Sequence, residues 1–289
     1  MLSFIERHFS GDGVIEDPPQ LYAMVATALL VGALLVGLDL RARRTGKSLF
    51  RRITLPPAVS RERQTLLAQA TLRASAVLIP VLVIARVLHE RLLPMQWFFG
   101  EDYGEDGLLE NLTVLGFVVA AVLFAAAWRR RPAGATGRIF LAIAAASLLV
   151  AMEEVSWGQR IFGWSTPAEV GAVNVQSETN LHNLVDNDAV RIAYPIIGIG
   201  IFLVLWLSCL LAIAAPGYRA RAVLPPPSLV LLAAAIAVGA QNFFFQELVE
   251  LLAAIFAGVF AAHVLAEADP RNQFAAADGR PPAAGPPRL

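Results

Sequence analysis

Seven long runs of apolar residues dominate this chain of 289 residues. The hydrocarbon core of a bilayer is about 30 Å thick, and an α-helix needs about 20 residues to cross it. Runs of about that length, bounded by charged residues or by Pro and Gly, cover residues 21–40, 72–92, 108–128, 139–157, 192–214, 228–243 and 247–266. We therefore predict an all-α, polytopic membrane protein with about seven transmembrane helices in residues 21–266.

The boundary between the last two runs is the least distinct. Gln241 and Asn242 interrupt an apolar stretch that is too long for one crossing, and Gly239 precedes them. We place the turn of a helical hairpin at these two amides. A re-entrant loop is the alternative, because irregular backbone survives at membrane depth where protein or water satisfies its polar groups.

Composition excludes several other classes of protein. Hydrophobic residues make up 57% of the chain and charged residues only 16%, against about 25% charged residues in ordinary soluble domains. Twenty-three basic and twenty-three acidic residues leave no net charge, so nothing indicates a nucleic-acid partner. The single cysteine, Cys209, excludes a disulfide framework or a cysteine-based zinc site.

The basic residues are distributed unevenly between the two sides of the predicted bundle. Seventeen Lys and Arg lie in the connections after the first, third and fifth runs and in the C-terminal tail, whereas four lie in the N-terminal segment and the alternate connections. The positive-inside rule then predicts an external N-terminal segment (residues 1–20) and a cytoplasmic tail (residues 267–289). That tail is rich in Pro, Ala and Gly and is predicted to be disordered.

Acidic and amide side chains gather at the predicted external ends of the helices and in the external connection over residues 158–190. An ionised carboxylate in hydrocarbon costs about 2.5–3.5 kcal/mol, so such residues usually face a bundle interior or a water-filled cavity. The candidate catalytic residues are Glu110, Glu153, Glu154 and Glu247. The candidate substrate-binding residues are Trp157, Gln159, Arg160, Asn180, Asn183 and Glu250.

Glu153 and Glu154 have two interpretations. Adjacent helical positions point about 100° apart, so at most one of the two side chains faces a shared cavity. In the first interpretation Glu153 forms a structural ion pair with Arg160, seven positions on, and Glu154 caps a helix. In the second, one of the two is a general base, a proton carrier or a ligand. Glu247 and Glu250 have a similar structural alternative, because acids complement the dipole at a helix N-terminus.

A candidate metal site lies in the external connection. Glu178, His182 and Asp186 share one face if this stretch is helical, and Glu and His at that spacing can bind one divalent metal ion. Glu110, Glu247 or Glu154 would add oxygen ligands, and His89 a second nitrogen. The alternative is a hydrogen bond between His182 and Glu178 with no metal.

One block of the sequence begins with Glu153-Glu154-Val155-Ser156-Trp157-Gly158-Gln159-Arg160 and continues through Thr166-Pro167. It ends with Asn174-Val175-Gln176-Ser177-Glu178-Thr179-Asn180-Leu181-His182-Asn183-Leu184. This block resembles one in a family of bacterial multi-pass membrane proteins to which no activity is assigned. The resemblance covers the middle third of the chain and implies a bacterial inner membrane. Glu110 to Thr113 is more distantly similar to a segment of the alkaline ceramidases, seven-span hydrolases. Those enzymes hold zinc with several histidines, whereas only His182 and His89 are available here.

Three functions are compatible with these patterns. The first is an integral membrane hydrolase or transferase that acts on a lipid or lipid-linked substrate at the external leaflet. Its chemistry would use a divalent metal as Lewis acid or a glutamate as general acid or base. The second is a proton- or cation-coupled transporter, and the third is a non-catalytic scaffold or assembly factor. Membrane lipid is the expected partner in each case.

Overall fold

A computed structural model of the chain describes residues 62–92, 95–100, 107–171, 179–180, 187–214 and 223–268. Every regular element within these ranges is helical. The first predicted span, residues 21–40, lies outside them, as do the N-terminal segment and nearly all of the tail.

The described helices are α4 (Glu62–Arg91), α5 (Gln96–Phe99), α6 (Leu108–Arg130), α7 (Gly134–Glu154), α8 (Gln159–Phe162), α9 (Ala168–Gly171), α10 (Asn187–Ala214), α11 (Val230–Gly239) and α12 (Gln246–Glu267). Short 3₁₀ turns, η2 (Ser156–Gly158), η5 (Pro227–Leu229) and η6 (Phe243–Phe245), lie between some of them.

Five of these helices are long and apolar enough to cross a membrane. Their apolar segments are Leu66–His89, Leu108–Arg130, Gly134–Glu154, Ile192–Leu210 and Gln246–Glu267. Each matches one of the runs in the sequence, so for the described residues the prediction of an all-α protein with several helices long and apolar enough to span a membrane is confirmed. The sixth run forms a shorter apolar helix, Pro227–Gly239.

The turn between α11 and α12 lies at the amides that interrupt the apolar stretch. The backbone leaves the helix after Gly239, and Asn242 Oδ1 accepts the N–H of Phe244 at 2.9 Å before α12 begins at Gln246. At Gly239 an added Cβ would come within 2.7 Å of the Val249 side chain, so this glycine allows the two helices to approach closely. The predicted position of the turn is therefore confirmed, whereas the sixth predicted span is not, because α11 has only 10 residues.

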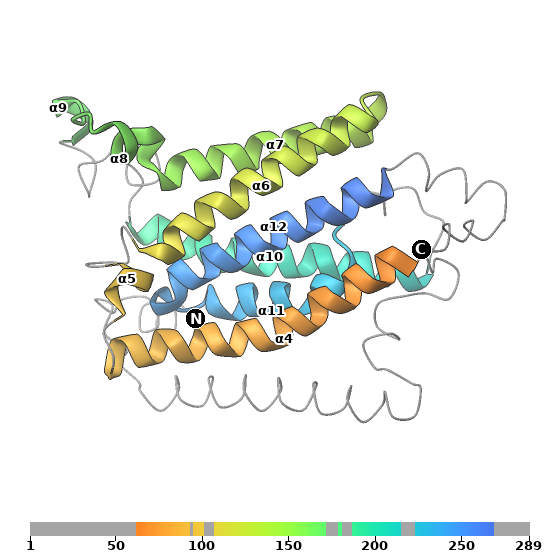
Figure 1. Cartoon of the computed structure of the whole chain (residues 1–289), viewed down its shortest axis with the longest axis horizontal. Coiled ribbons are helices and arrows are strands. Elements are labelled where there is room, and N and C mark those ends of the chain that lie inside the picture. Colours follow the sequence, from red (N-terminus) through yellow and green to blue (C-terminus); the bar gives the residue numbers. More distant parts are fainter. Residues whose placement is uncertain are drawn as a thin grey trace, which may run out of the picture.

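Helix α12 is the centre of the bundle (Figure 1). It packs against α6, α4 and α11, while α7 packs on α6 and α10 packs on α11. Half of the residues in its most apolar segment are buried, whereas 22–28% are buried in the corresponding segments of the other four long helices. Residues on α12 therefore have neighbours from three other helices, α4, α6 and α11.

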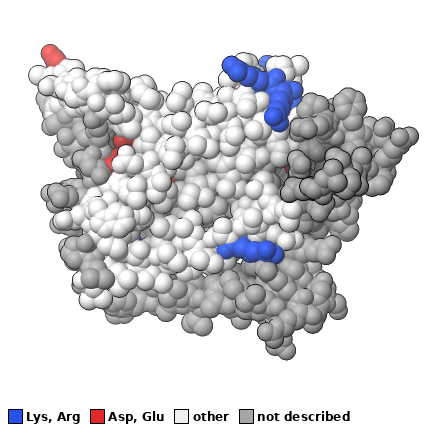
Figure 2. All heavy atoms as spheres, in the orientation of Figure 1, with Lys and Arg blue, Asp and Glu red and all other residues white. Residues whose placement is uncertain are grey.

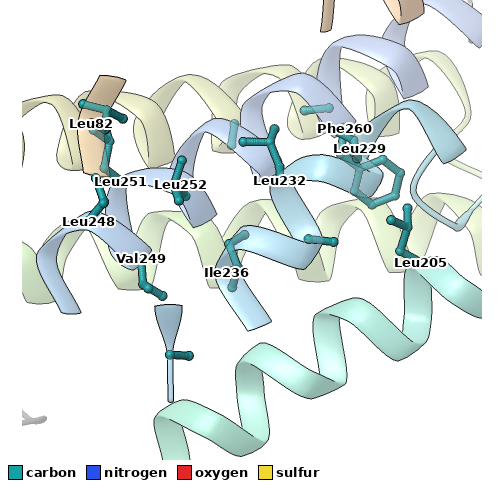
Figure 3. Packing of buried hydrophobic residues seen from close by; sticks show 14 of the residues in the cluster. Leu82, Leu205, Leu229, Leu232, Ile236, Leu248, Val249, Leu251, Leu252 and Phe260 are labelled. Carbon is teal, nitrogen blue, oxygen red and sulfur yellow. The ribbon is translucent and has the colours of Figure 1, made fainter. Parts of the chain in front are cut away.

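Large apolar side chains fill the space around α12, and small residues bring helices close together. Leu248, Leu251 and Leu252 lie near Leu82 and Ile236 in one buried cluster (Figure 3). Gly116 of α6 packs against Ala254 of α12, where an added Cβ would lie 2.9 Å from the alanine methyl. Close contact through small residues is the usual way in which helices associate within lipid.

The two ends of the bundle differ in the charged side chains that gather there. We call the end where α6 and α12 begin and α7 ends the acidic end, and the end where α6 and α12 end and α7 begins the basic end. In Figure 2 a group of basic side chains lies at the upper right and acidic side chains lie at the upper left, with a further basic side chain nearer the middle of the view. The described basic residues at the basic end are Arg129, Arg130, Arg131 and Arg138.

Candidate functional site

The acidic end is built by local features of each helix. Gly107 precedes α6, and its carbonyl accepts the Asn111 Nδ2 amide at 2.8 Å. An added Cβ at Gly107 would lie 2.4 Å from the Gly100 nitrogen, so Gly107 packs directly against the backbone at the end of α5, where a side chain would not fit. Glu110 follows in the first turn of α6.

Glu250, one turn into α12, is the central residue at the acidic end. Its Oε1 atom accepts a hydrogen bond from the Tyr194 hydroxyl of α10, and the Gln246 Nε2 amide lies 3.2 Å from the same oxygen. The side chain is half-buried. Two neighbours therefore hold one carboxyl oxygen of Glu250 in place between α10 and α12.

Two further carboxyl groups lie close to Glu250. Glu154, the last residue of α7, and Glu110 of α6 are both near enough to interact with Glu250 electrostatically. Both side chains are half-buried. We call Glu110, Glu154 and Glu250 the carboxyl cluster. Its members come from three helices, and gathering them at one point is unfavourable when all three are ionised.

Glu153 has a different environment from Glu154. Its Oε1 accepts the indole N–H of Trp157 at 2.5 Å, on the exposed side of α7. Glu154 therefore joins the carboxyl cluster, whereas Glu153 bonds to Trp157. The proposed partner of Glu153, Arg160, lies in α8, but its side chain is outside the described part of the chain.

A left-handed turn ends α7 three residues before the predicted limit of that span. Ser156, Trp157 and Gly158 have φ values of 47°, 57° and 92°, all in the left-handed region. That conformation costs a residue with a side chain roughly 1–2 kcal/mol. Two such residues in succession redirect the chain directly after Glu154.

Polar side chains after this turn hold together the connection between α7 and α10. Gln159 Oε1 accepts the Thr179 N–H at 2.7 Å and the Thr166 hydroxyl at 3.1 Å. The buried Asn180 side chain donates to the Ser156 hydroxyl oxygen at 3.4 Å. Gln159 and Asn180, predicted to bind substrate, therefore both take part in structural hydrogen bonds.

Arg86 and His89 of α4 form a separate group at the same end. The Arg86 guanidinium lies 4.7 Å from the Phe244 ring centroid and 5.5 Å from that of Phe99, and its Nε donates to the Phe244 carbonyl at 3.2 Å. The His89 ring stacks on Phe99 and accepts the Met95 N–H at Nδ1. This nitrogen is therefore engaged within the chain.

Several predicted residues lie outside the part of the chain that the structure describes. Glu178 and His182, the candidate metal ligands, are among them, together with Asn183 and Asp186. Across the described ranges, no group of three His, Cys, Asp or Glu residues is arranged to hold a metal ion. Glu247 is described, in the first turn of α12 beside the carboxyl cluster.

Tyr194 is not among the site residues that the sequence predicted. This residue lies near the start of an apolar run, where a tyrosine is commonplace at a membrane boundary. The only local indication of its role was a hydroxyl group two residues inside the predicted span. Its partner is 56 positions away, so only the packing of α10 near α12 reveals its role.

The comparisons with known proteins add no relative to this description. No family model matches the chain, and no curated protein or solved structure is significantly similar to it.

Proposed function

We propose that this protein is a membrane-embedded hydrolase or transferase that acts on a lipid or lipid-linked substrate at the bilayer boundary. The observation that supports the proposal best is the carboxyl cluster, in which Glu110, Glu154 and Glu250 meet from three helices and Tyr194 bonds to Glu250. Ionisable groups within membrane-spanning helices are costly and usually functional. Three carboxyl groups close together are more than helix capping requires.

The chemistry that suits this arrangement is proton transfer between carboxyl groups. In hydrolysis or group transfer, one carboxylate accepts the proton of the attacking water or hydroxyl, and a protonated carboxyl donates a proton to the leaving group. Neighbouring carboxyl groups can divide these two roles when their surroundings differ. The Tyr194 hydroxyl holds Glu250 in position and offers a path for the proton.

The location of the cluster favours a lipid as substrate. Glu110 and Glu250 lie about one turn inside the ends of apolar helices, and the faces of α6 and α7 near this end expose leucines such as Leu112, Leu148 and Leu149. A substrate that approaches over such a surface would be apolar over much of its length. A headgroup at the membrane boundary would then lie at the depth of the carboxyl cluster.

We also propose the full topology: seven spans in a bacterial inner membrane, with the acidic end external and the basic end cytoplasmic. The arginines at the basic end support this orientation through the positive-inside rule. Fusing a periplasm-dependent enzyme reporter and a cytoplasm-dependent fluorescent reporter to the C-terminus tests it. A fluorescent C-terminal fusion is expected, and an active periplasmic fusion would contradict the orientation.

A divalent metal remains part of the proposal through Glu178 and His182. A metal bound there would act as Lewis acid and activate water. Elemental analysis of purified wild-type protein beside His182→Ala tests this role. We expect stoichiometric metal in the wild type and its loss in the variant. Wild-type protein without stoichiometric metal would restrict the proposal to proton transfer by carboxyl groups.

The main experiment compares lipid products made by matched variants. Wild type, Glu250→Gln and Glu169→Gln are reconstituted into vesicles of a bacterial lipid extract, and products are identified by mass spectrometry. Glu169 lies on α9 and is exposed, so its variant is the control for loss of one charge. Because Glu250→Gln removes a titratable proton, we expect its product yield to fall by about 10²–10⁴-fold, with Glu169→Gln at the wild-type level.

Two outcomes would contradict the proposal. One is an unchanged lipid composition with the wild type, and the other is equal product from wild type and Glu250→Gln. Proton or cation uptake by the same vesicles that depends on Glu250 would instead favour the transporter. Loss of stability in Glu250→Gln, with neither lipid turnover nor uptake in any variant, would favour the scaffold.

A further inference from the structure

The segment after α7 leaves the bundle as a separate arm at the acidic end. We define this arm as residues 159–171, which contain α8 (Gln159–Phe162) and α9 (Ala168–Gly171). Figure 1 shows it beyond the end of α7, at the upper left. The left-handed turn at Ser156–Gly158 starts the arm, and a second glycine with positive φ, Gly163, ends α8.

The arm exposes large apolar side chains. Phe162 is 75% exposed and Ile161 67%, and the Trp164 side chain is also exposed. The rings of Phe162 and Trp164 stack with centroids 5.7 Å apart and an angle of 10° between their planes. Both rings lie over Gly158, where an added Cβ would be 3.1 Å from Phe162 and 3.3 Å from Trp164. The arm thus presents an ordered apolar surface rather than isolated side chains.

The position of the arm indicates what covers this surface. The arm follows the end of α7 at which Leu148 and Leu149 are exposed on the bundle. Trp97 of α5 is also exposed at the acidic end. Tryptophan and phenylalanine at the level where membrane helices end are typical of the boundary between headgroups and acyl chains. The exposed carboxyl of Glu169 lies farther along the arm, on α9.

We infer that the arm lies in the interface of the leaflet at the acidic end, with Ile161, Phe162 and Trp164 inserted among the lipids and α9 turned toward water. Short amphipathic segments bind in this way when an apolar face is buried about 5–10 Å into the headgroup and acyl boundary. The inference depends on the position and apolar surface of the arm and not on the reaction at the carboxyl cluster.

Site-specific fluorescence tests the depth of the arm. In a Cys209→Ser background, a single cysteine at Phe162→Cys carries an environment-sensitive fluorophore, and the full-length protein is reconstituted into vesicles of phosphatidylcholine and phosphatidylglycerol. We expect blue-shifted emission, quenching by lipids with a nitroxide high on the acyl chain, and protection from iodide. The matched control is Glu169→Cys on the same arm, for which we expect water-like emission and quenching by iodide.

Two results would overturn the inference. Iodide quenching at position 162 as strong as at position 169 would place the ring in water. Protection from iodide without quenching by nitroxide lipids would mean that protein, such as a second copy of the chain, covers the arm. If labelling at position 162 disturbs folding, unlabelled wild type and Trp164→Phe are compared in brominated lipid. The substitution should then remove part of the quenchable tryptophan emission, and no difference would overturn the inference.

Discussion

The acidic and basic ends are built from the same three helices but use their charged side chains differently. At the basic end, the Arg130 guanidinium donates to the Leu265 carbonyl at 3.0 Å, and that of Arg131 donates to the Glu267 carbonyl at 2.7 Å. These arginines satisfy carbonyl groups at the C-terminus of α12, where positive charge is favourable. At the acidic end, carboxyl groups from α6, α7 and α12 approach one another instead.

This difference indicates that the basic end contributes mainly to stability and the acidic end mainly to function. Arginines that bond to the last carbonyl groups of a helix need no further explanation. Like charges gathered at one point do not stabilise a bundle, and such clusters are typical of functional sites. We therefore expect substitutions toward the basic end to affect folding most, and substitutions in the carboxyl cluster to affect activity most.

The largest effect on stability is expected from Phe124→Ala, in the half of the bundle nearer the basic end. Phe124 is fully buried, and its ring lies 5.3 Å from that of Phe260 and 6.3 Å from that of Phe140. Removing a ring from such a site costs about 3–5 kcal/mol. Unfolding in mixed micelles with increasing denaturing detergent measures the loss. An equally large loss in Phe162→Ala, on the exposed arm, would contradict the contrast.

A smaller loss of stability is expected from Gly198→Ala, where α10 approaches α11. A Cβ at Gly198 would lie 2.8 Å from the Ala240 methyl and 3.2 Å from the Ile236 carbonyl oxygen, whereas one at Gly200 would meet nothing within 4 Å. Gly198→Ala should therefore destabilise the protein by about 1–3 kcal/mol. Because Tyr194 is one turn away, we also expect lower lipid turnover.

The control for this substitution is Gly200→Ala, on the same helix. It should leave the free energy of unfolding unchanged or raise it slightly, because alanine favours helix over glycine. Equal unfolding curves for the two variants would show that the contact between α10 and α11 is looser than described.

Gln159→Ala should loosen the connection between α7 and α10 without unfolding the bundle. The substitution removes the acceptor of two hydrogen bonds, to Thr179 and Thr166, and each contributes about 0.5–1.5 kcal/mol. Faster cleavage within residues 159–180 in limited proteolysis measures the effect. Gln241→Ala is the control, because that amide bonds only locally to the Ala237 carbonyl among the described contacts. Equal cleavage rates would contradict a tying role for Gln159.

The smallest change in stability is expected for Glu250→Gln, despite its large expected effect on activity. The amide keeps an oxygen for the Tyr194 hydroxyl and removes one charge from the carboxyl cluster. We expect the free energy of unfolding to change by less than about 1 kcal/mol. A loss as large as that of Phe124→Ala would assign the cluster a structural role and remove the distinction between the two ends.

Much of the fold could be predicted because its signals are local. The length of each apolar run identified the five long helices, and the amides at Gln241 and Asn242 located the turn before α12. The end of α7 was placed too late, because the left-handed residues at Ser156 and Trp157 have no composition that reveals them in advance. The shortness of α11 was likewise not visible in an apolar run that continues into the turn.

The sequence predicted how far along their helices the site residues lie, but not the direction in which each side chain points. The sequence determined that acids lie at one end of the helices, since charge and distance along a run are local properties. Only the tertiary structure decided that Glu154 rather than Glu153 joins the carboxyl cluster, that Glu250 is its centre and that Tyr194 bonds to it. The physical reason is helix rotation, because adjacent residues point about 100° apart and their neighbours depend on how the helices pack.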